Sequence, residues 1–167
     1  MTYLSHPRIV PDTVEERTYQ VSMARGCLKK DSLIILPTGL GKTVVALIVI
    51  SEVLEKGKKV LLLAPTKPLV DQHSMTFESW LKDTEISVLN GNMNPERRSS
   101  IIAESEMIVA TPQAVANDLE CGRYDLRDFG LVIYDEAHRG VGNYAYVSIA
   151  KYNTNGISMG MTASPGS

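Results

Sequence analysis

The fold is decided by the stretch Leu33-Ile34-Ile35-Leu36-Pro37-Thr38-Gly39-Leu40-Gly41-Lys42-Thr43. Its first four residues are apolar and predict a buried strand, and a glycine-containing turn follows them. Beyond the turn, residues 44–54 are too apolar and too long for anything but a buried helix. A strand, a glycine-containing turn and a helix N-terminus are the context that a phosphate-binding loop requires.

The residue types in this turn suit a triphosphate. Gly39 and Gly41 allow positive φ and let backbone N–H groups converge on phosphate oxygens. Lys42 would bind the β- and γ-phosphates, and the Thr43 hydroxyl would be a ligand for Mg²⁺. Leu36 stands where the usual pattern begins with glycine, so the alternative is a glycine turn followed by a solvated lysine. The flanking strand and helix favour the nucleotide site.

The composition is that of a folded domain. The chain has 167 residues, of which 44% are hydrophobic and 22% charged, enough for one domain with a full core. No apolar run approaches the ~20 residues of a membrane span, and no charged-then-apolar leader opens the chain. Cys27 and Cys121 lie far apart without metal or redox spacing, so we expect two reduced core thiols and a cytosolic context.

The net charge of −2 excludes a protein that is basic over its whole surface, but not one with a basic stripe on one face. Each candidate for such a stripe is, taken alone, an ordinary solvated surface charge. The candidates are Lys29, Lys30, Lys67, Arg97, Arg98 and Arg139.

The rest of the chain alternates between apolar strands and helices. Residues 1–11 predict an extended arm, and a capping box at Thr13–Glu16 predicts a helix that ends near Leu28. Further strands are expected at 60–64, 86–89, 107–110, 130–134 and 157–161, with helices at 69–80, 95–104, 112–119 and 144–152 between them. This alternation predicts a single α/β domain, 1–167, with a mostly parallel central sheet and helices on both faces.

Polar clusters follow the predicted strands. They stand at 37–43, 65–68, 90–92, 111–113, 135–138 and 162–164. In parallel sheets, ligands bind beyond the carboxyl ends of the strands. One edge of the sheet is therefore expected to hold all the candidate chemistry.

The apolar residues 131–134 deliver two acids to that edge. Asp135, at the strand end, is placed to hold the Mg²⁺ that bridges the β- and γ-phosphates. Glu136 can orient and deprotonate an attacking water. The alternative is a pair of solvated acids, but the preceding phosphate loop favours the catalytic interpretation. The second acid also favours hydrolysis over transfer to another acceptor.

The histidines lack the spacing of a metal site. His6 and His73 are isolated in the sequence, and His138 has no second histidine or cysteine near it. We therefore expect no zinc site, and His138 taken alone is more often a hydrogen-bonded structural residue.

Together these motifs resemble the first RecA-like domain of the superfamily two helicases. The resemblance covers nearly the whole chain and is carried by Pro37–Thr43, Ala64–Val70, Thr111–Gln113, Asp135–His138 and Thr162–Ser164. The longer strings at 135–147 and 161–167 look like the archaeal Hef and Fanconi-anaemia group M branch. The resemblance implies a RecA-like P-loop NTPase domain of the DEAH type that uses ATP and Mg²⁺.

The resemblance also assigns roles to residues. Arg17 would stack on adenine and Gln20 would hydrogen-bond its edge, which is feasible because they stand one helical turn apart. The phosphates would be held by Pro37, Thr38, Gly39, Leu40, Gly41, Lys42 and Thr43, and catalysis would rest on Lys42, Asp135, Glu136 and His138. Nucleic-acid phosphates would meet Thr66, Lys67, Gly91 and Thr111. Thr162 and Ser164 would sense the γ-phosphate through His138.

The family needs a second RecA-like domain for its arginine fingers, and the sequence stops after the third motif. We therefore expect a fragment of a longer DNA motor, with single-stranded and branched DNA as partner, no membrane partner, and a location in the cytoplasm, nucleoid or nucleus. Loss of the arginine finger would lower turnover about 10³-fold or more. The alternatives are an RNA-directed superfamily two ATPase, a P-loop kinase or GTPase, and a non-hydrolysing nucleic-acid-binding module. A GTPase would want an N-K-x-D element, which the sequence lacks.

Overall fold

The computed structural model describes residues 1–37, 41–137 and 143–163. Its strands are β1 (Ser32–Leu36), β2 (Lys59–Leu63), β3 (Ile86–Leu89), β4 (Met107–Ala110), β5 (Phe129–Asp135) and β6 (Ile157–Ala163). Its helices are α1 (Thr18–Cys27), α2 (Gly41–Glu55), α3 (Lys67–Trp80), α4 (Pro95–Glu104), α5 (Pro112–Glu120) and α6 (Asn143–Tyr152).

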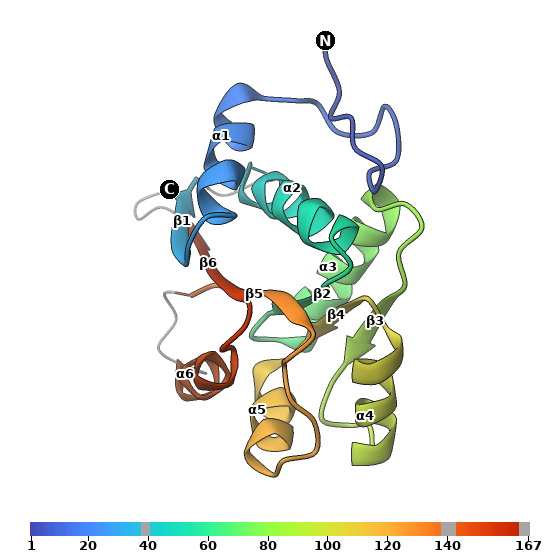
Figure 1. Ribbon diagram of the computed structural model, residues 1–167, viewed down its shortest axis with the longest axis vertical. Coiled ribbons are helices and arrows are strands. Elements are labelled where there is room, and N and C mark those ends of the chain that lie inside the picture. Colours follow the sequence, from blue (N-terminus) through green and yellow to red (C-terminus); the bar gives the residue numbers. More distant parts are fainter. Residues whose placement is uncertain (38–40, 138–142, 164–167) are drawn as a thin grey trace.

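All strand pairs of the sheet are parallel, in the order β1-β6-β5-β2-β4-β3. Helices α1, α2 and α3 lie on one side of it, and α4, α5 and α6 lie on the other (Figure 1). The predicted α/β class, with a parallel sheet covered on both faces, is confirmed.

Alternate residues of the central strands enter two separate cores. In β2, Val60 and Leu62 pack in the cluster with α1, α2 and α3. Leu61 and Leu63 pack in the other cluster, with α4, α5 and α6. All four are fully buried. This period of two explains why β2 is a continuous apolar run, since a strand covered on both faces needs apolar side chains at every position.

Helix α2 has the buried character that its sequence predicts. Val45, Leu47 and Ile50 are 0% exposed, and the helix packs against α1 and the central strands. With 15 residues it is shorter than the ~20 that a bilayer requires. Within the described ranges, no helix combines the length and apolarity needed to cross a membrane.

Strand β1 differs from its prediction as a fully buried strand. Ile34 is buried, but Leu33 and Ile35 are 55% and 50% exposed. The reason is that β1 lies at the end of the sheet order and pairs with β6 alone. An apolar run cannot distinguish an edge strand from a central one.

The capping box predicted at residues 13–16 is wrong, because this segment pairs with the N-terminal arm. Leu4 N donates to the Val14 carbonyl at 2.7 Å, and Leu4 and Ile9 of the arm are buried. Helix α1 therefore begins only at Thr18.

Side-chain caps begin two of the later helices. Thr66 Oγ1 accepts from Leu69 N at 3.4 Å, and Asn94 Oδ1 accepts from Arg97 N at 2.8 Å, as the sequence predicts for Asn94. Thr111 also occupies an N-cap position, but its side chain makes no capping hydrogen bond. Thr111 therefore has the predicted N-cap position but does not cap the helix with its side chain.

Candidate nucleotide-binding site

The carboxyl ends of β1 and β5 bring a lysine and two acids together. Lys42 lies in the first turn of α2, Asp135 ends β5, and Glu136 follows it. Lys42 Nζ is 3.5 Å from Asp135 Oδ1 and 3.6 Å from Glu136 Oε1. The three side chains are 12%, 3% and 19% exposed, so their charges interact with little screening by water. We call Lys42, Asp135 and Glu136 the lysine–carboxylate cluster.

The environment keeps Asp135 ionised. Burial raises the pKa of this carboxyl, but the hydrogen bond from His73 and the nearby charge of Lys42 hold the pKa below its ordinary value of 3.8. The backbone N–H of Glu136 contributes to the same lowering. A carboxylate here and the hydroxyl of Thr43 are the oxygen donors that Mg²⁺ prefers, so this donor set fits a magnesium ion shared with phosphates.

His73 is one of the residues that sequence reasoning missed. Its Nε2 lies 2.7 Å from Asp135 Oδ2, and its side chain is 12% exposed. In the sequence His73 has no second histidine or cysteine at metal spacing, but in the structure it contacts Asp135. His73 lies on α3, which follows β2, and β2 lies beside β5 in the sheet. The sequence does not reveal that strand order, so it gave no sign of this contact.

The backbone at Glu136 is strained. Its φ of 56° lies in the left-handed region, which residues with a side chain adopt at a cost. Hydrogen bonds hold the chain on both sides. Tyr146 Oη donates to the Asp135 carbonyl at 2.6 Å, and Ala137 N donates to the Met161 carbonyl at 3.0 Å. Tyr146, to which the sequence analysis gives no role of its own, therefore fixes the end of β5 from α6.

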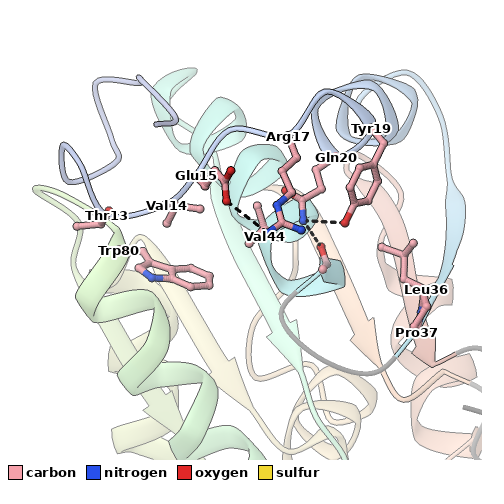
Figure 2. Close-up of a pocket in the computed structure, with 11 residues that line it drawn as sticks. Thr13, Val14, Glu15, Arg17, Tyr19, Gln20, Leu36, Pro37, Val44 and Trp80 are labelled. Carbon is pink, nitrogen blue, oxygen red and sulfur yellow. Dashed lines mark hydrogen bonds and ion pairs between the residues drawn. The ribbon is translucent and has the colours of Figure 1, made fainter. Parts of the chain in front are cut away.

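A cavity of about 510 Å³ adjoins the phosphate loop (Figure 2). Four of the predicted nucleotide contacts line it: Arg17, Gln20, Pro37 and Gly41. Trp80 from the end of α3 and Val14 line it as well, and sequence reasoning assigned neither to the site. The cavity is large enough for a nucleobase and combines an apolar wall with amide and guanidinium groups.

The two predicted base contacts differ in their surroundings. Gln20 is buried, and its Nε2 donates to the Gly41 carbonyl and to Tyr19 Oη, each at 3.4 Å (Figure 2). Arg17 is 56% exposed, and its Nη2 lies 3.3 Å from Glu15 Oε2. Gln20 thus contacts the backbone of the phosphate loop, whereas Arg17 stands at the solvent side of the cavity.

Gly41 stands at the start of α2 with ordinary space around it. It begins α2 without a positive φ, and an added Cβ would meet Leu36 Cδ1 and Tyr19 Oη at an ordinary 3.7 Å. Five further predicted site residues lie outside the described residues: Thr38, Gly39, Leu40, His138 and Ser164.

The predicted nucleic-acid contacts lie at the other half of the same sheet edge. Thr66 and Lys67 are exposed after β2, Gly91 is exposed after β3, and Thr111 is half-buried after β4. Because β2, β4 and β3 are consecutive neighbours, these loops are adjacent. Thr162, the predicted coupling residue, lies buried near the end of β6, between β1 and β5.

Arg98 is not part of a basic surface stripe, contrary to its prediction. It is 6% exposed and binds the fully buried Asp118 with Nε to Oδ2 and Nη2 to Oδ1, each at 2.8 Å. Its Nη1 also donates to the Met93 carbonyl in the loop after β3. The ion pair therefore ties α4, α5 and this loop together.

The family described as Type III restriction enzyme, res subunit, matches residues 13–167. This chain belongs to that family. Within it, the predicted resemblance to superfamily two helicases of the Hef and Fanconi-anaemia group M branch is confirmed by named relatives.

Two curated relatives and one solved structure illustrate the likeness. A Methanocaldococcus jannaschii protein named an ATP-dependent RNA helicase is 41% identical, over 99% of this chain and 22% of its own length. The Fanconi anemia group M protein of Gallus gallus is 35% identical, over 95% of this chain and 8% of its own length. The crystal structure of the Pyrococcus furiosus Hef helicase domain is 45% identical with a TM-score of 0.85, over 96% of this chain and 36% of that one. The chain thus spans about a third or less of each of them.

Proposed function

We propose that this domain is the ATP-binding half of an ATP-dependent DNA helicase or translocase that acts on branched or forked DNA. The observation that carries the proposal is the lysine–carboxylate cluster, in which Lys42 Nζ lies 3.5 Å from Asp135 and 3.6 Å from Glu136. A buried lysine between two acids, at the end of parallel strands and beside a base-sized cavity, is the arrangement that nucleotide hydrolysis needs.

In this proposal each member of the cluster has a separate task. Lys42 binds the β- and γ-phosphates, and its positive charge offsets the charge of the transferred group. Thr43 and Asp135 hold the magnesium ion, which neutralises phosphate charge when bound. Glu136 accepts the proton of the attacking water, and its side chain, 19% exposed, is within reach of solvent.

We assign the cavity to the adenosine. Gln20 is buried against the phosphate loop, and Arg17 lines the same cavity. Their amide and guanidinium groups suit the edge and the face of adenine respectively. Pro37, Thr38, Gly39, Leu40 and Gly41 complete the phosphate loop.

We assign the adjacent loops to the nucleic-acid backbone. Thr66, Lys67, Gly91 and Thr111 offer hydroxyl groups, a backbone N–H and a cation, which suit phosphate oxygens and do not read base sequence. Relatives that are named ATP-dependent DNA helicases favour DNA as the nucleic acid. An RNA substrate is the second candidate, since one relative is named an RNA helicase.

Hydrolysis in this proposal requires a partner, the second RecA-like domain of a longer chain. That domain would supply an arginine finger, whose contribution to turnover is about 10³–10⁵-fold. His138, Thr162 and Ser164 would report the γ-phosphate state to the nucleic-acid loops. The domain alone would bind nucleotide with little turnover, and it would work wherever the DNA is, in the cytoplasm, nucleoid or nucleus.

The test is an ATPase assay of the longer protein with single-stranded DNA, forked DNA and RNA as stimulants. Stronger stimulation by forked DNA supports the proposal, whereas stimulation by RNA alone supports the second candidate. Competition of GTP with ATP for this domain separates it from a GTPase. If no stimulant gave ATP turnover, the remaining interpretation would be a non-hydrolysing nucleic-acid-binding module.

A further inference from the structure

The His73–Asp135 contact is used by none of the steps assigned above. Asp135 is ionised and can only accept, so the proton on His73 Nε2 points to Oδ2 over 2.7 Å. The other carboxylate oxygen, Oδ1, accepts from Glu136 N at 2.9 Å and faces Lys42 Nζ at 3.5 Å. Each carboxylate oxygen of Asp135 thus accepts a hydrogen bond, and the two hydrogen bonds restrain rotation of the carboxylate about the Cβ–Cγ bond.

Helix α3 keeps the imidazole in place. The helix is capped by Thr66, and Val70 and Phe77 on its inner face are 0% exposed. The His73 ring lies 6.4 Å from the Phe77 ring, which in turn meets the Trp80 ring edge-on at 5.9 Å. Positions 73, 77 and 80 lie on one side of the helix. The imidazole therefore packs beside the Phe77 ring while its Nε2 contacts Asp135.

We propose that His73 is a positioning residue that orients the Asp135 carboxylate for magnesium-dependent nucleotide binding. This inference rests on the proposed function, because it gives Asp135 the magnesium. Groups that hydrogen-bond a metal-binding carboxylate fix its direction, and their loss typically costs about 10- to 100-fold in metal affinity or activity. With His73 removed, Oδ2 loses its donor, and the carboxylate is held only at Oδ1, by Glu136 N and the charge of Lys42.

The experiment measures ADP binding by calorimetry across a series of Mg²⁺ concentrations, on the chain and three variants. His73→Phe keeps a ring against Phe77 but has no N–H to donate. His73→Gln loses the ring but keeps a donor at the end of the side chain. The matched control is His6→Gln, because His6 Nε2 makes the same kind of contact with Glu52 Oε1, at 2.8 Å, outside the site.

We expect the half-saturating Mg²⁺ concentration to rise about tenfold in His73→Phe and to stay near the wild-type value in His73→Gln and His6→Gln. ADP affinity without Mg²⁺ and the melting temperature should change little in any of them. A purely structural role would move the melting temperature and leave the magnesium dependence alone.

Each other outcome counts against the inference. An unchanged Mg²⁺ dependence in His73→Phe, or an equal loss in His73→Gln, overturns it and leaves the proposed function standing. If His73→Phe unfolds, His73→Leu replaces it, and unfolding of both makes the histidine a structural contact. A wild-type chain that binds ADP no better than Lys42→Ala would remove the proposed function itself.

Discussion

Lys42 Nζ lies 3.5 Å from Asp135 Oδ1 although β6 separates their strands, β1 and β5, in the sheet. The lysine reaches across the end of β6 from the first turn of α2. Because Thr162 lies near the end of that intervening strand, it sits between the phosphate loop and the acids. Any change in the distance between lysine and acid on nucleotide binding would therefore occur beside Thr162.

Lys42→Ala should lower the affinity for ATP about 10- to 100-fold or more. A hydrogen bond to a charged group contributes roughly 1.5–3 kcal/mol, and the substitution also removes a positive charge from beside Asp135 and Glu136. Calorimetric titration measures the affinity, with Lys56→Ala as control, since Lys56 is exposed at the far end of α2. Equal affinities for the wild type and Lys42→Ala would remove the phosphate-loop assignment.

Glu136→Gln should keep nucleotide binding but reduce hydrolysis about 10²–10⁴-fold in the two-domain protein. The amide keeps the size of the side chain and cannot accept the proton of water. Steady-state ATPase assays measure the rate, and the exposed Glu104→Gln variant is the matched control. Turnover at the wild-type rate would refute the general-base role.

Lys67→Ala should weaken DNA binding and make it less sensitive to salt. Each phosphate contact releases counterions, so loss of one should reduce the slope of log affinity against log salt by about one unit. Fluorescence anisotropy with labelled single-stranded DNA at several salt concentrations gives the slope, with Lys56→Ala again as control. A slope that is identical in both variants would show that Lys67 does not contact phosphate.

Asp118→Asn should lower the free energy of unfolding by about 3–5 kcal/mol, because it leaves the buried Arg98 without its charged partner. Asp125→Asn is the control, since its pair with Arg127 is exposed on both sides. Urea unfolding followed by circular dichroism measures both. Equal losses in the two variants would contradict the distinction between buried and exposed pairs.

The same pair predicts a dependence on pH. Burial raises the pKa of Asp118, but hydrogen bonds from Arg98, Arg123 and Tyr124 bring the pKa below its ordinary value of 3.8. A carboxyl with a lower pKa in the folded state contributes stability above pH ~4 and loses it as the pH falls through the folded-state pKa. The stability difference between wild type and Asp118→Asn should therefore be constant from pH 7 to about 5 and shrink toward pH 3. A difference that grows on acidification would show the opposite shift.

Local patterns determined most of the elements. The limits of α4, β3 and β4 agree with the sequence analysis, because proline, asparagine caps and apolar periodicity act within a few residues. The convergence of Lys42, Asp135 and Glu136 also followed, since the carboxyl ends of parallel strands share an edge.

Tertiary structure decided whatever depends on which segments become neighbours. The exposure of Leu33 follows from the edge position of β1, and the late start of α1 follows from the pairing of Val14 with the arm. The contact of His73 with Asp135 likewise requires β2 beside β5. A residue's local pattern reports its own helix or strand, whereas strand order is chosen by the packing of the whole chain.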